Sequence, residues 1–188
     1  TLKTLQKDSI MIAGIDEVGL GCLAGPIISA AVVLGDFKDK VIFKDSKKTS
    51  EKNRRIQYNL IKQNCYYSIG VATPKEIDYF NVLKASHISM VRALNNLPIS
   101  PERVLIDGSH VPEGIQNGES LIKGDSLIQE ISAASVFAKV YRDYLMKIYA
   151  KKYTVYSFES NKGYPTPQHK TAISRYGLSE IHRKSFKI

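Results

Sequence analysis

Short apolar runs separated by amphipathic stretches predict a chain that alternates strands with helices. Ile10–Ile15 and Ile27–Leu34 are rich in β-branched residues and too short for buried helices, so each predicts a buried strand. Apolar residues alternate from Cys65 to Val71, which predicts a third strand because successive side chains on a strand point to opposite faces. Arg103–Gly108 and Glu119–Asp125 are two further strand-like runs, and each carries an acid at or near its end.

Four segments have the three- and four-residue spacing of helices. Residues 50 to about 64 are polar with one apolar side, and residues 83–97 form a second helix. A last helix begins at residues 166–167 and ends at Gly177. The strongest pattern follows a capping-box sequence at residues 126–129, and its apolar stripe is Leu127, Ile131, Ala134, Ala138, Tyr141, Leu145 and Ile148. The combination predicts an α/β fold, with a mixed sheet because short turns join the first strands.

The length of 188 residues suits one domain with a single core. We expect residues 1–188 to form that domain, with a helical C-terminal part from about residue 145. The net charge is +9, from 27 Lys and Arg against 18 Asp and Glu. Such an excess favours polyanionic partners, because neutralising phosphates releases condensed counterions. A lysine-rich solvated surface explains the charge equally well.

Three features bear on location. The cysteines, Cys22 and Cys65, form no disulfide framework, which favours a reduced, cytoplasmic protein. The first fifteen residues include Asp8 and lack an apolar run long enough for a signal peptide. Residues 18–35 carry no charge over a length that approaches a membrane span, but four glycines and Pro26 interrupt them. We therefore expect no membrane association, and we expect a monomer.

Acidic side chains follow apolar runs at three places, where an ionised carboxylate is costly. Asp16 and Glu17 end the first predicted strand, Asp107 ends the strand at 103–108, and Asp125 lies between a strand and a helix. A divalent cation offsets that cost, and oxygen ligands without a His or Cys cluster favour Mg²⁺ or Mn²⁺. Each acid alone is also explained by a solvated turn or a helix cap. Together with the basic charge, the acids predict two-metal phosphodiester hydrolysis.

The segment between the first two predicted strands is rich in glycine and reads GLGCLAG at residues 19–25. Its spacing differs by one residue from the dinucleotide-binding pattern, and a strand rather than a helix follows it, so we reject that function. Because glycine lacks a side chain, backbone amides in this loop can approach a sugar-phosphate closely.

Eight stretches between about residues 11 and 186 occur in the order of a known family. They are "GIDEVGLGCLAGPIISAAVVL", "DSKKTSEKNR", "NVLKASHISM", "VLIDG", "LIKGD", "ISAASVFAKVYRD", "NKGYPT" and "IHRKSF". In these stretches the chain resembles the type 2 ribonuclease H family, specifically bacterial ribonuclease HII, over essentially its whole length.

The resemblance implies a fold, an activity and a metal site. The implied fold is the ribonuclease H-like fold, a five-stranded mixed sheet flanked by helices, with a helical C-terminal part that helps clasp the duplex. The implied activity is endonucleolytic cleavage of RNA in RNA–DNA hybrids and at ribonucleotides embedded in DNA, which leaves 3′-hydroxyl and 5′-phosphate ends. The family's four metal-site acids, which bind Mg²⁺ or Mn²⁺ during catalysis, match Asp16, Glu17, Asp107 and Asp125.

The resemblance also implies substrate contacts. In the family a glycine loop senses the ribose 2′-hydroxyl with main-chain groups, and the matching residues are Gly19, Leu20 and Gly21. Leu20 replaces the usual arginine, which removes a cation near a phosphate. The tyrosine of "KGY", which packs on the sugar, matches Tyr164, for which a half-buried core tyrosine is the alternative.

Basic residues on the motif segments are candidates for phosphate contacts. A solvated charged face explains each of them as well, and an ion pair with Asp143 four residues away explains Lys139. The candidates are Lys47, Lys48, Lys139, Arg142, Arg183 and Lys184.

Two other functions are weighed against the ribonuclease HII prediction. Ribonuclease HIII usually carries an extra N-terminal substrate-binding domain, and only fifteen residues precede Asp16. A non-catalytic hybrid-binding protein weakened by Leu20 is disfavoured because all four acids are in place. The expected partners are RNA–DNA hybrids and DNA that contains ribonucleotides. The C-terminal sequence "SFKI" gives no indication of a replication clamp as a further partner.

Overall fold

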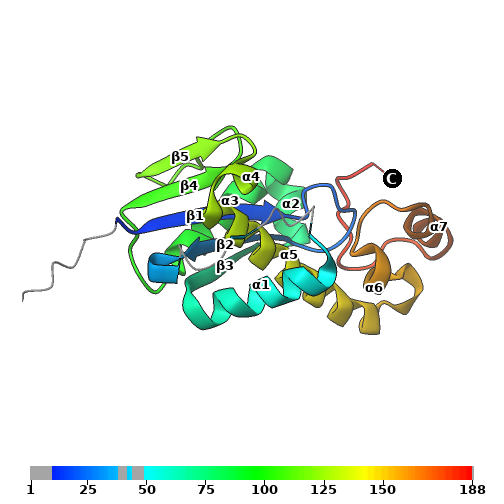
Figure 1. The fold of residues 1–188 in the computed structure, drawn as a ribbon. Helices are drawn as coiled ribbons and strands as arrows, with labels where there is room; N and C mark the ends of the chain where they lie inside the picture. Colours follow the sequence, from blue (N-terminus) through cyan, green and yellow to red (C-terminus); the bar gives the residue numbers. More distant parts are fainter. Residues whose placement is uncertain (1–9, 38–41, 44–48, 188) are drawn as a thin grey trace, which may run out of the picture.

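The structure is a computed structural model that describes residues 10–37, 42–43 and 49–187 (Figure 1). Its centre is a five-stranded mixed sheet in the order β3-β2-β1-β4-β5, which confirms the predicted fold class. β2 pairs antiparallel with β1 and β3, whereas β4 pairs parallel with β1 and β5. The strands are β1 Ile12–Val18, β2 Ile27–Val33, β3 Tyr66–Ala72, β4 Arg103–Asp107 and β5 Gly118–Leu121.

Helices cover both faces of the sheet (Figure 1). α1 and α5 pack on one face, where Phe137 lies in a cluster with Ile28 and other apolar residues of β2. α3 packs on the other face, where Met90 clusters with Ile15. All seven residues of β2 are buried, because helices lie on both sides of it. The helices are α1 Glu51–Asn64, α2 Pro74–Phe80, α3 Val82–Asn95, α4 Gly124–Leu127, α5 Gln129–Lys152, α6 Phe158–Asn161 and α7 Pro167–Tyr176.

The C-terminal part forms a second core against the loop between β1 and β2. Leu23 of that loop clusters with Met146 of α5, Phe158 of α6 and Ile173 of α7. In Figure 1 the segment after α7, coloured red, returns to lie beside the loop, which is coloured blue. An isolated antiparallel β-bridge between Ala24 and His182 joins the two segments. The loop is therefore held by chain that lies more than 150 residues away in the sequence.

The first strand is shifted along the chain relative to the prediction, since it begins at Ile12 rather than Ile10. β1 extends to Val18, because residues up to Val18 pair with β2. Asp16 and Glu17 therefore lie within the strand, whereas the sequence pattern places them at its end. Helix α2 is absent from the prediction, although Thr73 and Glu76 form a capping box at its start.

The long helix begins later than predicted, and its capping box is wrong. Ser126 lies inside the one-turn helix α4, and Ile128, the N-cap of α5, makes no side-chain capping bond. The stripe is only partly correct, since Leu127 and Ile148 are exposed whereas Ile131, Ala134 and Ala138 are buried. Leu127 lies outside the stripe because it belongs to α4, and the extended backbone of Ile128 separates α4 from α5. In the described part of the chain, no helix is long and apolar enough to cross a membrane.

Candidate metal centre and substrate loop

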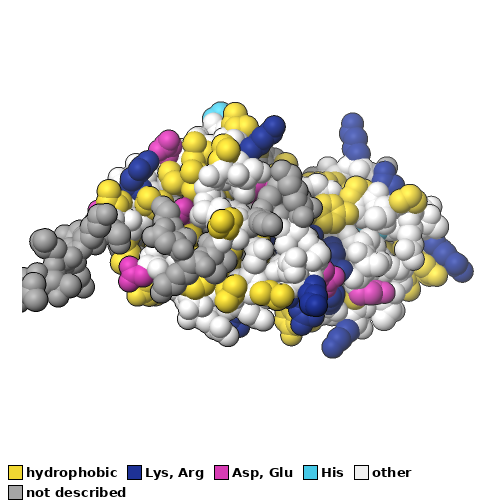
Figure 2. Space-filling view, viewed as in Figure 1, with side chains coloured by type: hydrophobic (Ala, Val, Ile, Leu, Met, Phe, Trp, Pro, Cys, Tyr) yellow, Lys and Arg dark blue, Asp and Glu magenta, His cyan; other side chains and the backbone are white. Residues whose placement is uncertain are grey.

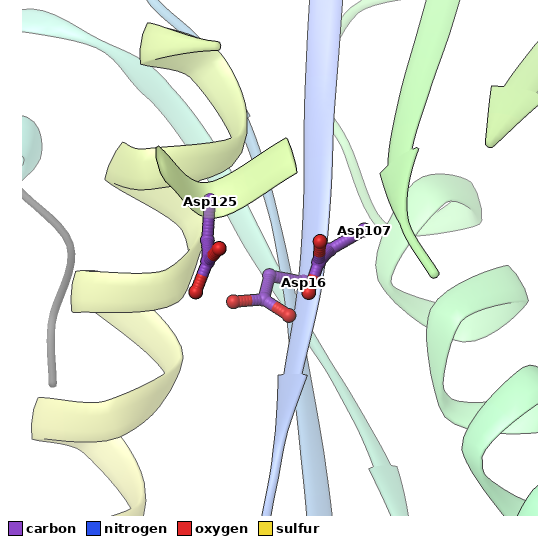
Figure 3. A group of neighbouring side chains, drawn as sticks. All are labelled: Asp16, Asp107 and Asp125. Atoms are coloured by element: carbon purple, nitrogen blue, oxygen red, sulfur yellow. The ribbon is translucent and has the colours of Figure 1, made fainter. Parts of the chain in front are cut away.

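Three carboxylates from distant parts of the sequence converge beside the central strands (Figure 3). Asp16 lies in β1, Asp107 is the last residue of β4, and Asp125 lies in α4. One carboxylate oxygen of each lies within 4.8 Å of those of the other two. β1 and β4 are parallel neighbours, so residues near their carboxyl ends share one edge of the sheet.

The short helix α4 brings in the third acid. The backbone N–H of Gly124 donates a hydrogen bond of 2.7 Å to Asp107 Oδ1, which fixes the start of α4 at the end of β4. Lys123, just before it, has a positive φ of 60°, so the chain turns sharply there. Figure 3 shows the carboxylate of Asp125 pointing from α4 toward that of Asp16. The break between α4 and α5 thus positions Asp125.

Asp16 is almost fully buried, with 4% of its surface exposed. Burial, then the negative charges of Glu17 and Asp107, raises the pKa of Asp16 well above its usual value. Hydrogen bonds from the Ser135 side chain and from the backbone N–H of Glu17 act in the opposite direction on this pKa. Ser135 is absent from the predicted site residues, although it is one of only two serines in the otherwise apolar stretch "ISAASVFA".

Glu17 lies beside the group of three rather than in it. Neighbouring residues on a strand point to opposite faces, so Asp16 faces α5 while Glu17 faces the side of α3. Glu17 lines a pocket there together with Asp107, Leu20 and His87. Its charge still acts on the pKa of Asp16. The structure therefore brings three of the four predicted acids into one cluster and places the fourth at its border.

The group of three carboxylates fits a hard divalent cation. Asp16 and Asp125 are each 4% exposed, and Asp107 is half-buried. Holding these carboxylates within 4.8 Å of one another is electrostatically unfavourable, and after burial and Glu17 the charge of Asp107 also raises the pKa of Asp16. A bound cation offsets that repulsion, and carboxylate oxygens are the ligands that Mg²⁺ and Mn²⁺ prefer.

Arg142 and Arg183 hold the glycine loop from inside, and their exposed surfaces are 0% and 1%. Arg183 donates to three loop carbonyl oxygens, those of Gly19 (2.6 Å), Leu20 (2.9 Å) and Gly25 (3.0 Å). Arg142 donates to the carbonyl oxygens of Ala24 (3.0 Å), Pro26 (2.9 Å) and Lys162 (2.8 Å). The phosphate contacts predicted for both arginines are therefore corrected: buried guanidinium groups that bind carbonyls do not face a phosphate.

This arrangement orients the backbone amides of the loop. In a trans peptide the C=O of one residue and the N–H of the next point in opposite directions. Because the carbonyls of Gly19 and Leu20 face Arg183, the N–H groups of Leu20 and Gly21 point away from it. Leu20 and Gly21 are exposed, and Gly19 adopts a positive φ of 101° that favours glycine.

Tyr164 lies next to this loop. It is half-buried, and burial together with the neighbouring Cys22 thiol raises its pKa to about 12. The amino group of Lys139 lies 5.4 Å from the centre of its ring. The structure thus brings Tyr164 and the glycine loop together, as the sequence motifs predict.

The remaining basic candidates differ in their surroundings. The amino group of Lys139 forms an ion pair of 2.9 Å with Asp143, which is the alternative to a phosphate contact at this residue. Lys184 is exposed, and Lys47 and Lys48 lie outside the described residues. On the face shown in Figure 2, Lys and Arg side chains gather with acidic ones near α1, α5 and α6.

Comparisons with known proteins identify the family and support the fold. The sequence profile of the Ribonuclease HII family matches residues 13–188. A ribonuclease HII from Shewanella piezotolerans is 46% identical over 186 residues, which cover 97% of this chain and 92% of the relative. The crystal structure of the ribonuclease H2 from Pyrococcus horikoshii superimposes with a TM-score of 0.79 at 27% identity, covering 95% of this chain and 94% of that one. A crystal structure of Bst-RNase HIII in complex with Mn²⁺ is similar in fold, with a TM-score of 0.71 at 18% identity, over 96% of this chain and 68% of that one.

Proposed function

The chain belongs to the ribonuclease HII family, and from that premise we propose that it nicks DNA at embedded ribonucleotides as well as degrading the RNA of RNA–DNA hybrids. Membership makes it a ribonuclease H, an enzyme that hydrolyses phosphodiester bonds of RNA paired with DNA. The observation that carries the finer proposal is the convergence of Asp16, Asp107 and Asp125 next to a loop with outward-facing amides.

The proposed chemistry is hydrolysis with two divalent ions, which leaves 3′-hydroxyl and 5′-phosphate ends. Asp16, Asp107 and Asp125, with Glu17 at their border, would hold the ions. When bound, the ions supply Lewis acidity at the attacking and leaving oxygens. Mg²⁺ and Mn²⁺ both suit these ligands, and the similar fold crystallised with Mn²⁺ supports this choice.

Recognition of ribose rests on the loop and Tyr164 in this proposal. The N–H groups of Leu20 and Gly21 donate to the ribose 2′-hydroxyl, which distinguishes RNA from DNA. The ring of Tyr164 packs on the sugar. Lys139 and Lys184 are the described candidates for phosphate contacts, because both amino groups lie on the motif segments.

The test uses a DNA duplex that contains a single ribonucleotide. With Mg²⁺ or Mn²⁺ the wild type nicks this duplex, and a chelator abolishes the nicking. Asp107→Asn keeps an oxygen that can accept from Gly124 N–H but loses the charge, so we expect at least about a hundredfold less activity. Asp36→Asn is the matched control, since Asp36 is exposed in a short 3₁₀ turn. Binding without nicking by the wild type contradicts the proposal.

A further inference from the structure

Two buried histidines meet behind the substrate loop, and the metal centre uses neither. His169 lies in α7 and is fully buried; His182 lies in the C-terminal segment and is 2% exposed. Their Nε2 atoms are 3.0 Å apart, which is a hydrogen bond between two imidazole rings. Tyr156 and Phe158 pack around the pair, with ring centres 4.8 Å from His182 and 5.3 Å from His169.

The partners of the two rings determine where each proton lies. The backbone N–H of Ser179 donates to His182 Nδ1 at 2.9 Å, so that nitrogen carries no proton and also accepts from the Ser179 hydroxyl at 2.7 Å. The carbonyl oxygen of Tyr164 only accepts, so His169 Nδ1, at 2.8 Å, carries its proton. With both rings neutral, His182 Nε2–H donates to the bare His169 Nε2. Every ring nitrogen therefore has at least one partner, and an added proton has no place that does not break a bond.

One end of this chain of hydrogen bonds fixes the backbone of Tyr164. Its carbonyl accepts from His169 and from the N–H of Thr166, at 2.8 Å each. Its own N–H donates to the carbonyl of Asn161 at 2.9 Å. Both peptide groups of Tyr164 are thus held, which leaves its side-chain torsions as the main freedom of the ring.

The second histidine of the pair, His182, connects to the glycine loop through its own backbone and through the next residue. His182 forms a backbone bridge with Ala24, and the next residue, Arg183, binds the loop carbonyls. The N–H of Arg183 also donates to the carbonyl of Leu23 at 2.9 Å. The two histidines therefore join the segment that carries Tyr164 to the segment that holds the loop.

We propose that His169 and His182 are positioning residues for ribose recognition, because their neutral hydrogen-bonded pair sets the backbone of Tyr164 relative to the glycine loop. The inference rests on the proposed function, in which Tyr164 and that loop contact the sugar. The pair acts through Tyr164 and touches no substrate itself.

The surroundings keep the pair neutral. Burial and the neighbouring His169 lower the pKa of His182 to about 4, and burial lowers that of His169. The Tyr156 ring faces both imidazoles. Four charged residues share the groove that His182 borders, two of each sign: Lys75, Asp78, Glu180 and Lys184.

A set of variants tests the proposal with the single-ribonucleotide duplex. His169→Phe keeps a ring but loses the bond to Tyr164, so we expect KM to rise about five- to tenfold, the effect of one buried hydrogen bond, with kcat changed less. His169→Asn can place its amide nitrogen where Nδ1 lies, so it should recover the part of KM that depends on the bond to Tyr164, although it loses the bond to His182. In a Tyr164→Ala background, His169→Phe should add almost nothing, because both changes act through one side chain. Binding to an all-DNA duplex should not change.

Additive effects of Tyr164→Ala and His169→Phe overturn the proposal, and so does a His169→Asn variant as weak as His169→Phe. ¹⁵N NMR of the ring nitrogens in the wild type tests the hydrogen-bond chain without any variant. His169 protonated at Nε2 instead of Nδ1 contradicts it. If the wild type nicks normally but the effects of Tyr164→Ala and His169→Phe on KM are additive, this inference alone is refuted. If the wild type nicks no duplex that contains a ribonucleotide, the proposed function is refuted.

Discussion

Asp16 illustrates how a single residue meets two opposing demands. Its neighbours Ala13 and Ile15 are completely buried, so the strand needs apolar surroundings, yet the site needs a carboxylate. The Ser135 side chain and the N–H of Glu17 supply hydrogen bonds that make an ionised form less costly there. A buried carboxylate with such hydrogen-bond partners is therefore stronger evidence of a functional site than an exposed carboxylate is.

At Leu20 we predict that an arginine strengthens binding to hybrid duplexes. Leu20 is 40% exposed and lines the pocket that contains Glu17 and Asp107, so an arginine there can reach a phosphate near the acids. Each new phosphate contact steepens the slope of log K against log salt by about 0.9 on duplex DNA, and we expect about that change for Leu20→Arg.

The measurement for Leu20→Arg is a salt titration of hybrid binding. Leu20→Gln is the matched control, since it adds polarity and length without charge. An unchanged slope in Leu20→Arg, or the same increase in Leu20→Gln, contradicts a phosphate contact at this position.

At the scale of elements, the contact between β1 and α5 determines the site. Gly14 of β1 lies directly against the backbone of Glu130 and Ile131, where α5 begins. The short helix α4, which carries Asp125, lies immediately before this start of α5. The close approach of strand and helix therefore controls how near Asp125 comes to Asp16.

We predict that Gly14→Ala destabilises the fold, because a β-carbon there collides with helix backbone that cannot rotate away. The expected loss of unfolding free energy is about 1–3 kcal/mol, as for overpacked cores. Urea denaturation measures it. Gly21→Ala is the control, since no atom lies within 4 Å of its new carbon, and its effect should stay below about 0.5 kcal/mol. Equal stabilities of the two variants refute the steric argument.

At the scale of the whole molecule, the return of the C-terminal segment links the second core to the catalytic domain. Asp78 of α2 accepts from the backbone N–H groups of Lys184 and Ser185, at 3.1 and 2.9 Å. Arg183 and His182 lie in the same few residues and bind the glycine loop and α7. This short segment therefore connects α2, the glycine loop and α7.

We predict that acid destabilises the protein through His182. Its pKa is about 4 in the fold and 6.5 ordinarily, so the unfolded chain binds a proton that the folded chain excludes. The contribution to stability is complete above pH 6.5 and is lost as the pH falls from 6.5 toward 4. The slope is about 1.4 kcal/mol per pH unit for one proton.

Urea denaturation at pH 8, 6.5 and 5 measures this loss. His182→Asn can still accept from Ser179 but does not titrate. As the pH falls, its free energy of unfolding should therefore decrease less steeply than that of the wild type, and the difference in slope should correspond to about one bound proton. His110→Asn, at an exposed position, should behave like the wild type. Parallel pH profiles of the wild type and His182→Asn contradict the prediction.

Local patterning alone determined much of this protein. Period-two and period-three-to-four spacings predicted β2, β3, β4, α1, α3 and α7 close to their observed bounds, because burial on one or both faces leaves a direct mark on residue order. The strand predicted at 119–125 is too long, since β5 ends at Leu121 and α4 begins at Gly124. The motifs predicted the family, which the profile match and the relatives confirm. The acids were recognisable only as a set, because a turn or a helix cap explains each one alone but does not explain why all of them follow apolar runs.

Only the tertiary structure decided which of these residues act together. The break at Ile128 follows from how α4 docks on Asp107, a contact between residues 17 apart that no local pattern encodes. Arg142 and Arg183 looked like surface cations, because sequence shows charge but not the carbonyls that surround it. Burial and partner choice depend on segments that meet only after folding, and they separate the residues that hold the loop from those that face the substrate.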